Sequence, residues 1–187
     1  MTDSEAFLNI RLNARLQPMH RHELFEDPLI EAFEKSGAAE VDGGGTEQTK
    51  SGEVAYCEIG VVAKSASKEL VSTIVSILEE CGAPKGSRIT SEALSAPVDF
   101  GTEEGLALYL NGRELPDEVY SEYDVNEVIA ELDGALGDAG RLTSWFEGAK
   151  ETGLYFYGDS FGAMAEAMLP IINSNPLCAL SRVEQIA

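Results

Sequence analysis

The chain has 187 residues, 44% of them hydrophobic, which is enough apolar material to form a folded core in one domain or two small ones. Its 33 acidic and 13 basic side chains give a formal net charge of −20, so we expect it to repel nucleic acid and anionic lipid and to attract basic partners. No apolar run approaches the roughly 20 residues that span a bilayer, and the first residues lack the basic-then-apolar order of a secretory signal, which predicts a cytoplasmic protein.

The first elements in the chain are a predicted strand and a predicted helix. Apolar and polar residues alternate from Phe7 to Leu16, as is typical of a strand, with Phe7 counted among the apolar positions. Asp27 and Pro28 resemble an N-cap and a first helical residue, and Gly37 is a typical helix end. Residues 27–37 are therefore expected to be helical, and the stretch before them is expected to be a loop.

A hairpin, a second helix and a short strand follow. Lys50-Ser51-Gly52 favours a hairpin turn, and Ser67 favours the start of a helix whose apolar stripe stops at Gly82. The expected elements are strands over 38–48 and 53–63, a helix from 67 to about 82 and a strand near 86–94.

The second half of the chain repeats this pattern. LNARLQP at 12–18 returns as LNGRELP at 110–116, and the later features recur at offsets near 98–101. The corresponding predicted elements are strand 105–113, helix 124–137, strands 140–148 and 151–158, helix 160–174 and strand 180–186. Matching segments in the same order predict a tandem duplication, with repeats at 1–95 and 103–187 and a short linker at 96–102.

The order strand, helix, strand, strand, helix, strand is that of a ferredoxin-like βαββαβ unit, an α+β fold in which helices cover one face of an antiparallel sheet. Each repeat has fewer than 100 residues and so buries only a modest core alone. We therefore expect the two repeats to pack as one compact body.

The repeated heptamer has two interpretations. The first is structural: the heptamer ends a strand and leads into a helix. Turns that follow strands favour Asn and Pro in any fold, so the repeat needs no functional explanation. The second is functional: Arg15 and Arg113 would mark two equivalent sites.

Residues suited to catalysis are few. His20 and His22 are the only histidines, and Glu23, Glu26 and Asp27 lie close to them in sequence, but two ligands specify a metal site weakly. Exposed or capping histidines are the favoured interpretation, with no metal, no cofactor and no catalytic residue predicted. The sequence carries no local signature of a nucleophile triad, so we lean against an enzyme. The three cysteines are expected to be reduced.

Three consecutive glycines at 43–45 also have two interpretations. Glycines that hold phosphate precede a helix, whereas here a strand is expected, so a bulge or a close backbone approach is favoured. The alternative is a groove for a small ligand or metal, possibly in an enzyme. Its lining would be His20, Arg21, His22, Asp42, Gly43, Gly44 and Gly45.

The most acidic part of the chain is 99–138, where 12 carboxylates face a single basic residue, Arg113. Tyrosines lie among the acids in the stretch PDEVYSEYD, and such a mixture supplies both burial and charge for a basic protein partner. The candidate partner-binding residues are Asp117, Glu118, Tyr120, Glu122, Tyr123 and Asp124. The alternative is a solvated loop and helix start, where acids favour the helix dipole.

LNARLQPMHRHELFEDP, VDGGGT and GLALYLNGRELPDEVY resemble a family of small acidic bacterial proteins, over nearly the whole chain. The resemblance implies a bacterial origin but supplies no catalytic residues. More loosely, the chain is similar in type to immunity proteins that neutralise bacterial toxins, often basic nucleases. The first hypothesis is therefore a non-catalytic protein-binding module for a basic partner. The second is a small-ligand or metal-binding protein that uses the histidine and glycine segments.

Overall fold

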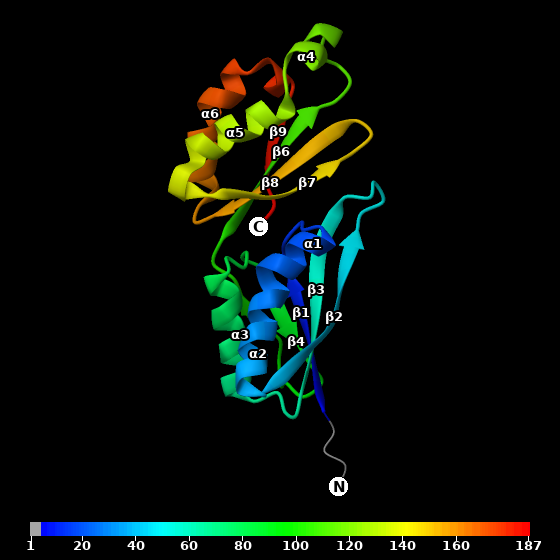
Figure 1. The fold of residues 1–187 in the computed structure, drawn as a ribbon, viewed down its shortest axis with the longest axis vertical. Helices are drawn as coiled ribbons and strands as arrows, with labels where there is room; N and C mark the ends of the chain where they lie inside the picture. The colour runs from blue at the N-terminus through cyan, green and yellow to red at the C-terminus, as the bar shows by residue number, and fades with distance from the viewer. Residues whose placement is uncertain (1–4) are drawn as a thin grey trace. The chain divides into compact units, whose positions relative to one another are not determined.

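The computed structural model describes residues 5–187. The chain divides into two compact units: unit 1 contains residues up to Lys50 and Val54–Thr102, and unit 2 contains Glu103–Ala187 together with Ser51–Glu53 of the β2–β3 turn. Figure 1 shows the elements of both. Each unit is built around one antiparallel sheet with its own helices. No helix of the described part of the chain is long and apolar enough to cross a membrane.

Unit 1 contains a five-stranded sheet in the order β2-β3-β1-β4-β5. Its strands are β1 (Ala6–Leu12), β2 (Ala39–Gln48), β3 (Val54–Ala63), β4 (Ser87–Thr90) and β5 (Val98–Phe100). Its helices are α1 (Pro18–Arg21), a π-helical turn (His22–Glu26), α2 (Asp27–Ser36) and α3 (Lys68–Glu80). Helices α2 and α3 lie side by side over one face of the sheet (Figure 1).

Alternation along β1 decides which side chains meet those helices. The fully buried positions are Leu8, Ile10 and Leu12, which share one face because side chains alternate along a strand. Phe7, which the sequence analysis grouped with the apolar positions of this strand, falls on the other face and is 51% exposed. The Phe7 side chain therefore lies on the face of the sheet that the helices do not cover.

The helix after β1 begins earlier than predicted. Pro18 occupies the first turn of α1, and helical backbone continues through the π-helical turn into α2, with Glu26 and Asp27 both in the right-handed helical region. Asp27 is therefore not an N-cap, and the histidines lie on helical backbone and not on a loop. The helix ends as expected, at Gly37 with a φ of 62°.

The other elements of unit 1 follow the sequence closely. The Ser67 side chain caps α3 by accepting a hydrogen bond from the Leu70 amide at 3.2 Å. The final strand is shorter than predicted, since β4 ends at Thr90. Residues Val98–Phe100 lie in the stretch expected to be a linker, but they form β5, which pairs with β4 and adds an edge to the sheet.

Unit 2 has a four-stranded sheet in the order β7-β8-β6-β9. Its strands are β6 (Glu104–Asn111), β7 (Arg141–Glu147), β8 (Glu151–Gly158) and β9 (Arg182–Gln185). Its helices are α4 (Asp117–Glu122), α5 (Val125–Leu136), the 3-10 turns Gly137–Ala139 and Pro176–Cys178, and α6 (Phe161–Ser174), which continues through Pro170. Apolar residues of β6, β8, α5 and α6 form its core.

The two sheets share one connectivity. Removing the extra edge strand β5 leaves the order β2-β3-β1-β4 in unit 1, which matches β7-β8-β6-β9 in unit 2 element by element. In both units the first strand lies between the third and the fourth, as in the ferredoxin-like fold. The prediction of a duplicated α+β ferredoxin-like unit is confirmed.

Candidate functional site

The segment after β1 is organised by a buried ion pair. Arg21 Nε donates to Glu26 Oε1 at 2.6 Å across the π-helical turn, and both side chains are about nine-tenths buried. The other carboxylate oxygen of Glu26 lies 3.0 Å from His22 Nδ1, and Asp27 Oδ1 lies 3.3 Å from His22 Nε2. The hydrogen bond to Glu26 and the charge of Asp27 raise the pKa of His22.

Arg21 also connects this turn to the glycine segment of β2. Its Nη1 donates to Gly45 O and to Thr46 Oγ1, both at 2.9 Å. A Cβ on Gly44 would come within 2.9 Å of the Arg21 guanidinium and within 2.8 Å of Glu26 Oε1. Gly44 is therefore required because side chains from the helical turn press against the strand.

The bulge that the sequence favoured falls at Asp42 and Gly43, while Gly44 and Gly45 pair regularly with Ile59 and Glu58 of β3. The pairing of β2 with β3 shifts register between Val41 and Gly44, and Gly43 has a φ of 82°. Of the candidate groove residues, the structure brings together Arg21, Gly44 and Gly45 through the contacts above, and the Arg21 side chain occupies the space beside the glycines. Among residues 5–187, no group of three or more His, Cys, Asp or Glu side chains could hold a metal ion.

The two heptamers carry out the structural task expected of them. Leu12 ends β1 and Pro18 starts α1, while Asn111 ends β6 and Pro116 precedes α4. In unit 2 the Asn111 side chain accepts hydrogen bonds from the amides of Arg113 and Glu114, which turns the chain. Arg113 itself donates to the Ala149 carbonyl at 2.6 Å.

The candidate acidic surface, formed by the six predicted partner-binding residues, lies on α4 and at the start of α5. The tyrosines differ: Tyr120 is half-buried against the core of unit 2, whereas Tyr123 is 40% exposed. The Tyr120 hydroxyl donates to Asn111 O and accepts from the Leu115 amide, both at 3.1 Å. These two bonds fix Tyr120 against the second heptamer.

The acidic residues of this surface also differ in whether the fold uses them. Asp124 is the N-cap of α5, since its Oδ1 accepts a hydrogen bond from the Asn126 amide at 2.8 Å. Asp117, Glu118 and Glu122 are exposed, and within residues 5–187 they take part in no ion pair. Their charge is therefore not neutralised by the unit that carries them.

A shallow hollow of about 510 Å³ lies in this surface. Its lining combines predicted and unpredicted residues: Tyr120, Ser121, Glu122, Tyr123, Asp124, Val125 and Leu177. Leu177 comes from the 3-10 turn after α6, more than 50 positions away in the sequence, and Val125 is 37% exposed. The structure thus places an apolar floor between the acids, and no sequence signal pointed to Leu177.

The cysteines do not form a reactive group. Cys57 and Cys178 are buried, Cys81 is half-buried, and all three are free thiols. Burial, with the Glu131 carboxylate as a smaller cause, raises the pKa of Cys178 to about 11. Burial also raises the pKa of Cys57, whose Sγ donates to the Ala14 and Leu16 carbonyls. High thiol pKa values suit structural cysteines.

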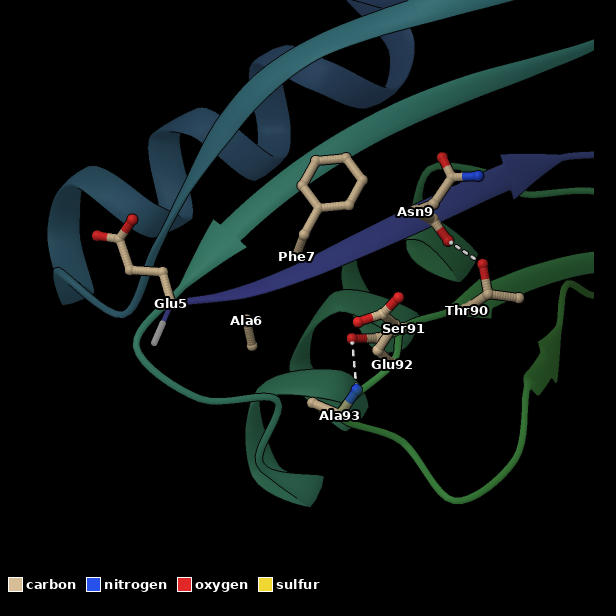
Figure 2. Close-up of a pocket in the computed structure, with 8 residues that line it drawn as sticks. All are labelled: Glu5, Ala6, Phe7, Asn9, Thr90, Ser91, Glu92 and Ala93. Carbon is tan, nitrogen blue, oxygen red and sulfur yellow. Dashed lines mark hydrogen bonds between the residues drawn. The ribbon is translucent and has the colours of Figure 1, made fainter. Parts of the chain in front are cut away.

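A further set of residues was missed by the sequence analysis. A hollow of about 810 Å³ lies beside the first half of β1, just beyond the end of β4, and is lined by Glu5, Ala6, Phe7, Asn9 and residues 90–93 (Figure 2). One signal was available: Phe7 is a large apolar residue in register with the polar positions Asn9 and Arg11.

Comparisons with known proteins give only distant structural similarity. No protein-family model matches the chain, and no curated protein sequence matches it significantly. The ligand-free regulatory subunit of aspartate kinase from Thermus thermophilus is 15% identical, with a TM-score of 0.28 over 92% of this chain and 95% of that one.

Two other solved structures are similarly distant. A putative monooxygenase from Fusobacterium nucleatum is 8% identical over 99% of this chain and 92% of that one, with a TM-score of 0.32. The first two RRM domains of yeast poly(U) binding protein are 12% identical over 97% and 99%, with a TM-score of 0.24. These values carry no argument about function, and the chain's own strand order establishes its fold.

Proposed function

We propose that the chain is a non-catalytic protein-binding module whose acidic surface on α4 and α5 binds a basic protein. The observation that carries the proposal is the hollow between Tyr120, Tyr123 and Leu177, bordered by acids that have no ion pair within residues 5–187. Tyr120 is already held in place by its hydrogen bonds, so a partner that buries surface against Tyr120 and Leu177 loses little side-chain entropy there. The carboxylates accelerate the encounter with a positively charged surface.

The surrounding charge supports this assignment. Residues 99–138 hold 12 acidic side chains and one basic one, of which Asp99 pairs with Arg88 and Glu103 with Arg141. The remaining excess of acids attracts lysine and arginine side chains and repels nucleic acid. The looser similarity in type to immunity proteins favours one form of this proposal, a cytoplasmic bacterial protein that neutralises a basic toxin. The interpretation as a small-ligand or metal protein at His20, His22 and Gly43 to Gly45 stays a prediction.

Charge reversal tests the proposal. The triple variant Asp117→Lys/Glu118→Lys/Glu122→Lys removes the free acids and spares the capping Asp124. The matched control is Glu34→Lys/Glu47→Lys/Glu80→Lys, which changes the net charge equally at exposed positions of unit 1. Association with the basic protein captured by the wild-type chain would be measured by surface plasmon resonance at several salt concentrations.

We expect the unit 2 variant to associate about tenfold more slowly at low salt and to lose most of its salt dependence. The unit 1 control should retain both. Equal loss in the two variants would show that net charge alone drives binding and would overturn the proposed surface, as would unchanged kinetics in both.

A further inference from the structure

A second hollow lies in unit 1, formed by β1, the end of β4 and the turn that follows, and Phe7 and Asn9 border it from the open face of the sheet. Helices α2 and α3 cover the opposite face (Figure 1). The hollow there has a volume of about 810 Å³. This volume falls within the range of about 300–1,000 Å³ that is usual for small-molecule sites.

Phe7 provides an aromatic surface at this hollow. Its ring extends over the neighbouring strand at Gly60, where an added Cβ would come within 3.1 Å and 3.2 Å of two ring atoms. The ring therefore needs glycine at position 60 to lie where it does. About half of Phe7 remains exposed, and Figure 2 shows it beside Glu5 and Asn9 on the same side of β1.

The polar groups around Phe7 include one side-chain acceptor that no donor of the described residues fills. The Asn9 side-chain Nδ2 donates to Glu58 Oε1 at 3.0 Å. The side-chain oxygen Oδ1 of Asn9 accepts no hydrogen bond within residues 5–187. The Thr90 hydroxyl lies 3.4 Å from the Asn9 main-chain carbonyl, and Ser91 Oγ accepts from the Ala93 amide at 3.2 Å (Figure 2). The open side-chain oxygen of Asn9 therefore favours a ligand that supplies a hydrogen-bond donor.

The charge of the hollow is negative. Glu5 and Glu92 are exposed at its border, and within the described part of the chain neither carboxylate has a hydrogen bond or an ion pair. The lining contains no lysine, arginine or histidine. An anionic ligand would be repelled, whereas a cation would be attracted to the acids and to the face of the aromatic ring.

We propose that this hollow binds a small organic cation, a protonated amine attached to an apolar body. The apolar body would contact Phe7. The ammonium group would donate to Asn9 Oδ1 and to the carboxylates of Glu5 and Glu92. A bare metal ion fits less well, because one face of the site is aromatic and no metal-holding cluster exists among residues 5–187. The site lies in unit 1 and does not depend on the acidic surface of unit 2.

Binding of 2-phenylethylammonium chloride to the full chain tests the assignment. Isothermal titration calorimetry and amide chemical-shift mapping would compare it with 2-phenylethanol, which has the same body without the charge. The site variants are Phe7→Leu, which keeps an apolar cover over Gly60, and Glu5→Gln/Glu92→Gln. The matched control is Glu34→Gln/Glu80→Gln, with the same change in charge at exposed positions elsewhere in unit 1.

We expect the amine to bind the wild-type chain more tightly than the alcohol, with shifts centred on β1 and residues 90–93. The double Gln variant should weaken binding about threefold to tenfold at low salt, and Phe7→Leu about twofold to fivefold, while the control retains wild-type affinity. Melting curves of each variant without ligand check that the fold is intact.

Absence of amine binding to the wild-type chain would overturn the proposal. So would equal affinity for the alcohol, or equal weakening by the site and control variants, because both would indicate binding without recognition of the cation. A short arginine-containing peptide serves as a second probe. If it shifts the same residues while the amine does not, the site takes a protein side chain and the small-ligand assignment is wrong.

Discussion

The segments that follow β1 and β6 occupy the same place in the two units but treat charge in opposite ways. In unit 1, Arg21 and Glu26 form a buried pair that also holds His22 and the bulge of β2. In unit 2, the acids of α4 are exposed and have no ion pair within residues 5–187. One copy uses charge to hold its own fold, and the other presents charge at its surface.

The two segments therefore place different demands on their own sequences. A buried ion pair demands a partner with good geometry, so Arg21 restricts which residues are tolerated at Glu26 and Gly44. Exposed acids impose little on the unit that carries them, because solvent screens their charge. We therefore expect substitutions in the unit 1 segment to change stability and substitutions in the unit 2 segment to change binding.

The largest expected effect is on the buried pair. Glu26→Ala leaves the Arg21 guanidinium buried without its carboxylate, which should lower the free energy of unfolding by about 3 kcal/mol. Glu122→Ala, the exposed counterpart in α4, should change it by less than about 0.5 kcal/mol. Urea denaturation followed by circular dichroism measures both, and similar losses in the two variants would erase the contrast between the segments.

Next in size is the effect of a methyl group at the glycines. Gly44→Ala would place Cβ within 2.8 Å of both Glu26 Oε1 and the Glu58 carbonyl oxygen, and should cost about 1–3 kcal/mol of stability. Gly134→Ala on α5 meets nothing within 4 Å and should stabilise the chain by about 0.5–1 kcal/mol, since alanine favours helix. The melting temperatures of Gly44→Ala and Gly134→Ala, each compared with wild type, measure both effects. If both variants shift in the same direction, the proposed role of Gly44 is wrong.

The smallest effect concerns pH. His22 has a raised pKa because it bonds Glu26 and lies beside Asp27, so folding favours its protonated form. Its contribution is complete below the unfolded pKa of about 6.5 and is lost as pH rises through the higher folded pKa. A magnetic resonance titration of the His22 ring should give a pKa above 6.5, and Asp27→Asn should lower it. A wild-type value at or below 6.5 would contradict this account.

Much of the architecture was accessible from the sequence because it depends on local rules. Ser67 caps α3, Gly37 ends α2 and the second repeat's strands fall within a few residues of their predicted limits. Caps, turns and alternation act over a few residues, so a single chain displays them. The errors arose where neighbours in space override those rules: the Arg21 and Glu26 pair accompanies helical backbone before Asp27, and pairing with β4 orders Val98–Phe100.

The candidate sites divide in the same way. The sequence identified the acids and tyrosines of α4, because composition reveals them, but it missed Leu177 beside them and the hollow around Phe7. Both hollows combine residues that are more than 50 positions apart in the chain. The sequence by itself determined the duplicated βαββαβ order and the distribution of charge, since periodicity and composition are properties of the chain. Only the tertiary structure decided which charges are neutralised and which apolar surfaces stay open, because those depend on contacts between segments that the sequence keeps apart.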